Sequence, residues 1–226
     1  MQRASTFFTQ DETARIEAAV AEAEANTSAE ILPVVATASG RYDRPEDIAG
    51  LWCGALAAAI VWLLFRAAPQ PHGGWDFQWT SLELPALLLA LVAGFLAGTA
   101  AGSSFGSLRR LFTPNNQMRD DVALRARQVF FDSRVHHTRA GTGVLIYLSV
   151  FERTAAVLAD ETVVQKLGQN TLNALCAELT EGMRGEARAD VLCNAIERAG
   201  DALARVLPRE PDDVNELQNT LLVLDE

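Results

Sequence analysis

Two long apolar blocks interrupt a chain whose other segments alternate between helical and strand patterns. No charged residue occurs from Ile48 to Phe65, a span of 18 residues, or from Leu84 to Leu108, a span of 25 residues. A helix needs about 20 apolar residues to cross a bilayer, and the helices of soluble domains rarely lack charge on every face. We therefore expect a transmembrane hairpin over 48–108, with helices at about 48–65 and 84–106. A pair of core helices in a soluble protein is the alternative.

Arginine placement predicts the orientation of this hairpin. Arg41 and Arg44 precede the first block, Arg109 and Arg110 follow the second, and the 18 residues between the blocks hold only Arg66. Lys and Arg are enriched on the cytoplasmic flanks of membrane helices. The first 47 residues hold no apolar run long enough for a signal peptide. The sequence thus predicts a two-helix protein of the bacterial plasma (inner) membrane, with both termini and the soluble domain in the cytoplasm.

Small residues recur every four positions in both blocks, so each set lies on one helix face. The two sets are Gly50, Gly54 and Ala58, and Gly94, Gly98, Gly102 and Gly106. Small residues at this spacing let helix backbones approach closely in lipid. We favour packing within the hairpin over packing between protomers. The lack of charge inside either block argues against an ion path or a proton relay.

The segment before the hairpin predicts a helix followed by a strand. Thr9 and Glu12 have the spacing of a capping box, and apolar residues then recur with the helical period. Residues Ile31 to Thr37 form a strand pattern. Because Pro33 cannot donate a backbone hydrogen bond, we expect this strand to be an edge strand or to be bulged there.

The segment after the hairpin completes an α/β pattern. Thr113 and Pro114 are typical of a helix start. Val144 to Val150 is almost continuously apolar, which predicts a central strand, and Thr154 to Leu158 predicts its hairpin partner. Two or three helices follow, at about Thr171–Gly182 and Ala187–Leu207 among them. Residues 5–42 and 109–207 would then form one domain with helices on the faces of a small sheet. The acidic tail 208–226, with an apolar run from Leu221 to Leu224, either packs as a small element or stays mobile.

Charge is unevenly distributed along the chain. The formal net charge is −10, which argues against general nucleic-acid binding. Seven arginines and three aspartates lie from Arg109 to Arg139, whereas Glu152 to Glu226 holds fifteen acids and seven bases. This polarity suggests that one face lies toward anionic lipid; a solvated helix face is the alternative. Three cysteines without paired spacing do not indicate a disulfide framework.

Two runs resemble the TPM-domain family, which includes plant thylakoid proteins of photosystem II repair and many bacterial membrane proteins. The first run is Ser28–Val35, and the second is Thr138–Arg153 continuing to Asp160, with Gly143, Glu152, Arg153 and Asp160 as its motif residues. The resemblance implies an α/β/α sandwich with a short four-stranded sheet, which here would be interrupted by the hairpin. It also implies calcium binding in some members and a claimed acid phosphatase activity in the thylakoid members.

The candidate chemical groups each have a structural alternative. Asp160 and Glu161 follow a strand, where, with Glu30, they would hold calcium or magnesium through oxygen atoms or cap the next helix. Glu152 and Arg153 form either an ion pair or a solvated turn. His136 and His137 would point to opposite faces of a strand and so are a poor metal site. Cys176 and Cys193 have the pattern of buried small apolar residues.

Two functions follow from this pattern. The first is an integral membrane protein whose TPM-like cytoplasmic domain is a non-enzymatic module for binding, assembly or quality control, with the lipid bilayer and an unidentified protein as partners. The second, implied by the resemblance alone, is a metal-dependent phosphatase-like hydrolase that uses Asp160, Glu161 and Glu30. The chain has no phosphate loop, dinucleotide fingerprint, nucleophile elbow or zinc-ligand spacing.

Overall fold

The computed structural model describes residues 2–42, 44–67, 77–104, 110, 113–138, 141–185, 187–212 and 215–225. The chain divides into two compact units. We call Arg41–Pro114 the hairpin unit, and we call Gln2–Gly40 together with Asn115–Glu226 the sheet unit.

The sheet unit is built on a mixed four-stranded sheet in the order β3-β2-β1-β4. Strand β1 (Glu30–Ala36) is parallel to both β2 (Gly143–Ser149) and β4 (Leu222–Leu224), whereas β3 (Thr154–Ala159) is antiparallel to β2. The predictions of an α/β class, of a central β2 and of a β2–β3 hairpin are therefore confirmed. The tail of the chain packs: it supplies β4.

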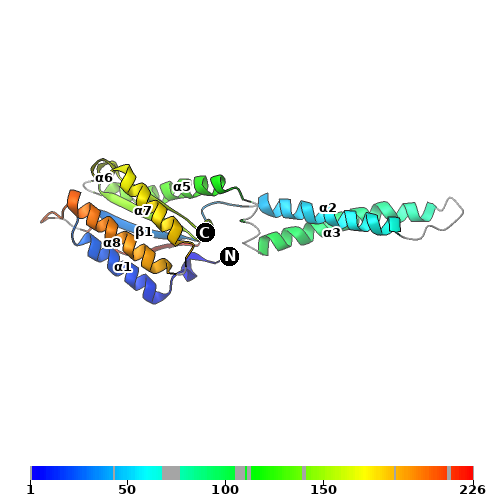
Figure 1. Cartoon of the computed structure of the whole chain (residues 1–226), viewed down its shortest axis with the longest axis horizontal. Coiled ribbons are helices and arrows are strands. Elements are labelled where there is room, and N and C mark those ends of the chain that lie inside the picture. The colour runs from blue at the N-terminus through cyan, green and yellow to red at the C-terminus, as the bar shows by residue number, and fades with distance from the viewer. Residues whose placement is uncertain are drawn as a thin grey trace. The chain divides into compact units, whose positions relative to one another are not determined.

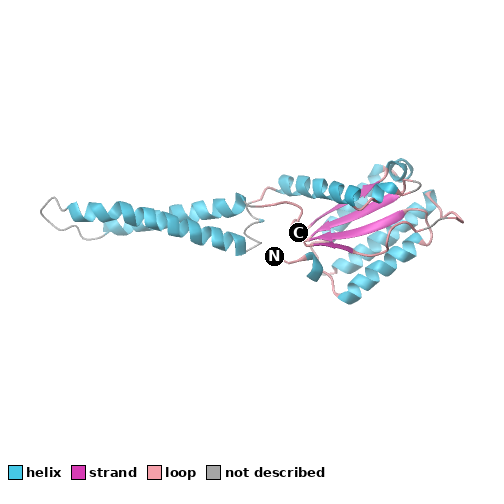
Figure 2. Ribbon diagram, turned by 180° about the vertical axis from the view of Figure 1, so that it is seen from behind, coloured by secondary structure: helices cyan, strands magenta, loops and turns pink. Residues whose placement is uncertain are grey.

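Helices cover both faces of this sheet (Figures 1 and 2). One face carries α1 (Gln10–Glu24), α7 (Gln169–Gly182) and α8 (Arg188–Val206), together with the short α6 (Glu161–Leu167). The other face carries α5 (Asn115–Asp132). Short 3-10 turns lie at Ala4–Thr6 and Val135–His137. The unit is thus a three-layered α/β/α sandwich.

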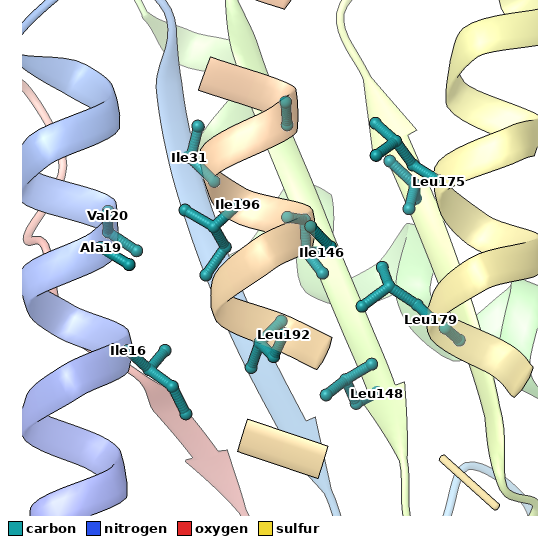
Figure 3. Close-up of a cluster of buried hydrophobic side chains, with 14 of the residues drawn as sticks. Ile16, Ala19, Val20, Ile31, Ile146, Leu148, Leu175, Leu179, Leu192 and Ile196 are labelled. Atoms are coloured by element: carbon teal, nitrogen blue, oxygen red, sulfur yellow. The ribbon is translucent and has the colours of Figure 1, made fainter. Parts of the chain in front are cut away.

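Strand alternation separates two apolar cores. Ile31 and Ile146 point toward α1, α7 and α8, where they meet the inward stripes of these helices, shown in Figure 3. Val34 and Leu145 point the other way and meet the inward stripe of α5. The stripe of α5 consists of Val122, Ala126, Val129 and Phe130. A period of two in the strands and of about 3.6 in the helices therefore produces the layers.

The structure confirms the predicted capping box of α1 and corrects the predicted edge position of β1. The capping box is present: the Thr9 side chain accepts a hydrogen bond from the Glu12 N–H, and the Glu12 carboxylate accepts one from the Thr9 N–H. Strand β1, by contrast, is not simply an edge strand, because it lies between β2 and β4. Its pairing with β4 begins only at Val34, so Pro33 lies in the half of β1 that lacks a neighbour on that side.

The hairpin unit consists of α2 (Arg44–Ala67) packed along α3 (Phe77–Ser104). Helix α2 extends beyond its charge-free block at both ends, and α3 begins seven residues before its block. Asp47–Ala67 and Leu82–Gly102 are each 21 residues long, with mean hydropathies of 2.2 and 2.1. By length and composition, each is able to cross a membrane.

Candidate functional site

The two helices of the hairpin unit touch through their glycines. A Cβ atom built on Gly98 would lie 2.8 Å from the Cα of Gly50, and one built on Gly94 would lie 2.9 Å from the Cα of Gly54. The helices therefore approach until backbone meets backbone, and the structure brings both predicted glycine sets into one interface within the hairpin. Of the other predicted members, Gly102 is buried and Ala58 is half-buried. Gly106 lies outside the described residues.

The outward side of the hairpin is a bare apolar surface. In the most apolar stretch of each helix, only 17% of α2 and 6% of α3 is buried. The exposed side chains include Leu51, Trp52, Leu56, Ile60, Leu63, Leu64, Leu84, Leu88, Leu89, Val92 and Leu96. Contiguous apolar surfaces of this kind mark contact with lipid or with another protein.

A larger side chain at Gly98 should separate the two helices. Gly98→Val would place carbon atoms into the backbone of α2, and such overpacking costs about 1–3 kcal/mol. We expect a lower melting temperature for the hairpin in detergent micelles, measured by circular dichroism of the full chain. Ala97→Val, at an exposed neighbouring position, is the matched control and should melt like the parent. Equal melting of the two variants would contradict a glycine-dependent interface.

A closed polar cluster lies at the carboxyl ends of β1 and β2. Glu152 is 2% exposed, and its carboxylate accepts hydrogen bonds from the N–H groups of Ser39 (2.8 Å) and Gly40 (3.3 Å) and from the Ser149 hydroxyl. The Ser39 hydroxyl donates to Ser149 Oγ at 2.9 Å and lies 2.9 Å from the Tyr147 hydroxyl. Burial, joined by the nearby Glu152 charge, raises the pKa of Tyr147. The cluster ties the end of β1 to the β2–β3 turn.

Sequence reasoning missed the partners of Glu152. Ser39 lies more than a hundred positions away in the chain, and no local spacing links the two. Arg153, for which an ion pair with Glu152 and a solvated turn were the alternatives, is exposed in a turn and has a φ of 49°. It occupies the left-handed position of the turn, which a β-carbon disfavours.

Removing the Glu152 carboxylate should destabilise the sheet unit. Glu152→Ala would leave buried N–H donors without an acceptor, and each buried unpaired group costs about 1–3 kcal/mol. We expect the urea midpoint of the full chain, followed by limited proteolysis, to fall for Glu152→Ala and to fall less for Glu152→Gln, which keeps an acceptor oxygen. Arg153→Gly should be neutral or stabilising, because glycine adopts a positive φ without strain. An unchanged midpoint in Glu152→Ala would show that the cluster does not hold the fold.

Gly143 and Asp160 fix the opposite end of the β2–β3 pair. A Cβ atom on Gly143 would lie 2.1 Å from the Val135 carbonyl oxygen, so only glycine fits there. The Gly143 N–H donates to Asp160 Oδ2 at 3.2 Å, and the Asp160 N–H donates to the Gly143 carbonyl at 2.9 Å. Asp160 stands at the N-cap position of α6, yet its side chain makes no capping bond. Burial raises the pKa of Asp160, against the lowering effects of the Gly143 N–H and His136.

The structure does not gather the predicted metal ligands into one group. Both Glu30 oxygens accept backbone hydrogen bonds, from the N–H of Glu216 at 3.1 Å and from that of Leu217 at 3.2 Å. Glu161 Oε1 accepts from Gln165 one turn along α6. Among the described residues, no three His, Cys, Asp or Glu side chains lie together as a metal site would require. The carboxylates as placed do not fit a calcium ion, which takes six to eight oxygens.

The other candidate residues have packing roles. His136 and His137 lie in a 3-10 turn, not on a strand, and their rings are neighbours with centroids 5.1 Å apart. His136 also packs edge-on against Phe131 at 4.9 Å. The Cys176 thiol donates to the Ala155 carbonyl at the outer edge of β3, and Cys193 is buried.

Two buried carboxylates hold the segment that leads to β4. Glu24, at the end of α1, accepts hydrogen bonds from the Ile31 N–H at 2.7 Å and from the Asn215 side chain at 3.4 Å. Glu30 accepts hydrogen bonds from the backbone N–H groups of Glu216 and Leu217. Burial raises the pKa of Glu24 from its ordinary value of 4.5 to about 7, and the charge of Glu30 adds to this effect. The Ile31 N–H, Asn219 and Arg209 oppose it.

The raised pKa of Glu24 predicts a stability that falls as pH rises. Between pH 4.5 and about 7 the folded chain binds a proton that the unfolded chain has lost, so stability is greatest below this window and is lost across it. Glu24→Gln should remove this dependence and stabilise the sheet unit at pH 8 by about 1–3 kcal/mol. Urea titrations of the full chain at pH 5 and pH 8 measure it. Glu22→Gln, exposed on the same helix, is the control; identical pH profiles for Glu24→Gln and the parent would contradict the prediction.

A pocket of about 760 Å³ opens near the amino ends of β1 and β2. Its lining includes Ser28, Glu30, Thr138, Thr142, Lys166 and Arg209. The hydroxyl groups are already engaged: Thr142 donates to the Ser28 carbonyl at 2.8 Å, and Thr138 accepts from the Thr142 N–H at 2.8 Å. Ligands of open α/β sheets usually bind at the carboxyl ends of the strands, where Glu152 is enclosed. Among the lining residues that the structure describes, Thr138, Thr142 and Glu30 thus already serve hydrogen bonds within the fold.

Comparison with known proteins supports the fold. No protein-family model matches the chain, and no curated protein matches it significantly. Among solved structures, the chain is similar to the NMR structure of BA42 protein from the psychrophilic bacterium Bizionia argentinensis, with 19% identity and a TM-score of 0.54. The match covers 96% of this chain and 94% of that chain. At this identity the similarity concerns the fold alone.

Proposed function

We propose that the protein is anchored in the bacterial plasma membrane by α2 and α3 and carries its sheet unit in the cytoplasm as a non-enzymatic binding module for membrane-protein assembly or quality control. The observation that carries this proposal is the bare apolar surface around both helices of the hairpin unit. In water, each exposed apolar square ångström would cost about 25 cal/mol, and lipid removes that cost.

The hairpin also has the internal properties that a bilayer demands. A helix satisfies its backbone hydrogen bonds within itself, as lipid requires, and Pro85 removes one such bond near the amino end of α3. The glycine interface gives the helices a contact that does not depend on a hydrophobic drive. At the end of α2, the Arg66 guanidinium lies over the Trp62 ring, 4.9 Å from its centroid. An aromatic ring paired with a cation at a helix end is typical of the membrane–water interface.

The cytoplasmic orientation is supported by the arginines outside the hairpin. Arg41, Arg44, Arg109 and Arg110 flank the two ends that join the sheet unit. At the other end of the hairpin the sequence holds one Lys or Arg residue, Arg66, in the last turn of α2. Each arginine near a cytoplasmic surface gains about 1 kcal/mol from anionic lipid. This difference favours retention of the sheet unit on the cytoplasmic side.

The role as a binding module is supported by how the motif residues are used. Both oxygens of Glu152 accept hydrogen bonds, from backbone N–H groups and from Ser149. Asp160 Oδ2 accepts one from the Gly143 N–H, and Gly143 makes room for Val135. A hydrolase would need such carboxylates open to a substrate or an ion. The hydrolase alternative has no comparable support, since Asp160, Glu161 and Glu30 do not converge.

Thiol labelling in cells tests the anchor and its orientation. In a chain with Cys53→Ala, Cys176→Ala and Cys193→Ala, a cysteine at Gln70, in the connection between the helices, should react with a membrane-impermeant reagent added to intact spheroplasts. A cysteine at Glu22, exposed on α1, should react only after the membrane is opened. Labelling of both from outside would reverse the orientation of the sheet unit. Release of the chain by alkaline carbonate would overturn the anchor itself.

A further inference from the structure

The sheet unit exposes large apolar side chains mainly on one helix. Within the part of the chain that the structure describes, the exposed large apolar residues lie in the hairpin unit, except for Leu124 (58% exposed), Phe131 (59%) and Val223 (40%). Leu124 and Phe131 both lie on α5. We call Leu124, Arg127 and Phe131, with Arg134 just beyond the helix, the outer face of α5.

Helix geometry places these residues on the side away from the sheet. Met118, Val122, Ala126, Val129 and Phe130 are the buried stripe of α5. Leu124 and Phe131 are seven positions apart, and thus two turns apart on one line of the opposite side. The Phe131 ring is held in place by edge-on contacts with Phe130 at 5.9 Å and His136 at 4.9 Å. This exposed ring is therefore a fixed feature of the surface.

Charge separates this face from the rest of the sheet unit. Helix α5 carries three arginines and three aspartates, and the exposed Arg134 follows it. Gln2–Gly40, by contrast, holds six acids and two arginines, and the segment from Gly141 to Glu226 holds fifteen acids and seven bases. The exposed Asp120 lies one turn before Leu124 on the same side of α5, where Arg127 and Arg134 outnumber it. An anionic membrane surface attracts this net positive charge and repels the more acidic parts of the sheet unit. The outer face of α5 is therefore the face that best approaches anionic lipid.

The link between α3 and α5 is short. Ten residues lie between the end of α3 at Ser104 and the start of α5 at Asn115. Fully extended, such a link spans about 35 Å. A short link raises the effective concentration of the membrane surface at α5, so a weak contact suffices to hold it there.

We propose that the outer face of α5 rests on the anionic lipid headgroups of the membrane that α2 and α3 span. Leu124 and Phe131 enter the headgroup layer, and Arg127 and Arg134 pair with lipid phosphates. This proposal rests on the proposed membrane anchor and adds an orientation for the sheet unit. The acidic helices α1 and α7, with the charge-balanced α8 beside them, then face the cytoplasm and are available to a protein partner.

Fluorescence quenching in nanodiscs tests the contact. The full chain, in the same cysteine-free background, carries one environment-sensitive dye at Phe131→Cys, at Trp52→Cys on α2 or at Asn194→Cys, which is exposed on α8. The discs contain phosphatidylcholine alone or an equimolar mixture with phosphatidylglycerol, with lipid spin labels as quenchers. We expect quenching at Trp52→Cys in both discs, at Phe131→Cys strongly in the anionic discs, and at Asn194→Cys in neither.

Charge variants make the test specific. Arg127→Glu with Arg134→Glu should abolish most of the quenching of a dye at Leu124→Cys, whereas Arg127→Lys with Arg134→Lys should retain it and Arg205→Glu on α8 should leave it unchanged. High salt should weaken the quenching, because it screens surface charge. These results would support the proposal.

Three results would overturn it, and they differ from failure of the anchor. Quenching at Trp52→Cys without quenching at Phe131→Cys would show that the anchor stands while α5 stays off the membrane. Equal quenching at Phe131→Cys in both discs would remove the role of anionic lipid. A disulfide between two chains at Leu124→Cys, formed at the expense of quenching, would assign the face to a second copy. Failure of the anchor itself would appear as an absence of quenching at Trp52→Cys.

Discussion

The structure of this chain depends on what surrounds α2 and α3, two helices that carry no charge on any side within their apolar spans. Such helices fold in water only if other surfaces cover them, and few of their described residues are buried. They touch each other at Gly50, Gly54, Gly94 and Gly98, where backbones meet. This contact pairs the helices but leaves their leucine-rich outer surface exposed. A contiguous apolar surface of this kind marks contact with lipid or with another protein, and the proposed membrane anchor rests on it.

The insertion point of the hairpin unit explains how a soluble fold tolerates it. Parallel strands such as β1 and β2 need a crossover connection, which here runs through α5. Lengthening a surface connection costs little, because closure entropy rises only with the logarithm of loop length. The sheet unit compensates with contacts across the insertion: Glu152 binds the N–H groups of Ser39 and Gly40, and β1 pairs with β2 over its full length. Glu152, one of the residues on which the family resemblance rests, thus helps to close the fold around the insertion.

Features set by neighbouring residues were predictable from the sequence, and features set by distant residues were not. The capping box of α1, the buried strand β2 and the charge-free helices each follow from a local pattern, and the structure has them. Strand β4 did not follow, because a short apolar run at Leu221–Leu224 is ambiguous until β1 offers it an edge. Pro33 was expected in an edge strand or at a bulge. In the structure β1 lies between two strands, but its pairing with β4 begins only after Pro33, at Val34. The partners of Glu24, Glu30 and Glu152 are backbone N–H groups brought near by folding, which no spacing in the sequence encodes.

Three buried or half-buried acids in one small unit make a consistent physical pattern. Glu24, Glu30 and Glu152 each satisfy backbone donors at places where the chain leaves regular structure. A carboxylate that accepts two backbone hydrogen bonds rigidifies a junction, but it is then occupied and offers little to a substrate. The exposed acids on α1, such as Asp11 and Glu22, are different, because water still reaches them. If α5 faces the lipid as proposed, α1 lies on the cytoplasmic side, and its net negative charge would favour a partner with basic character.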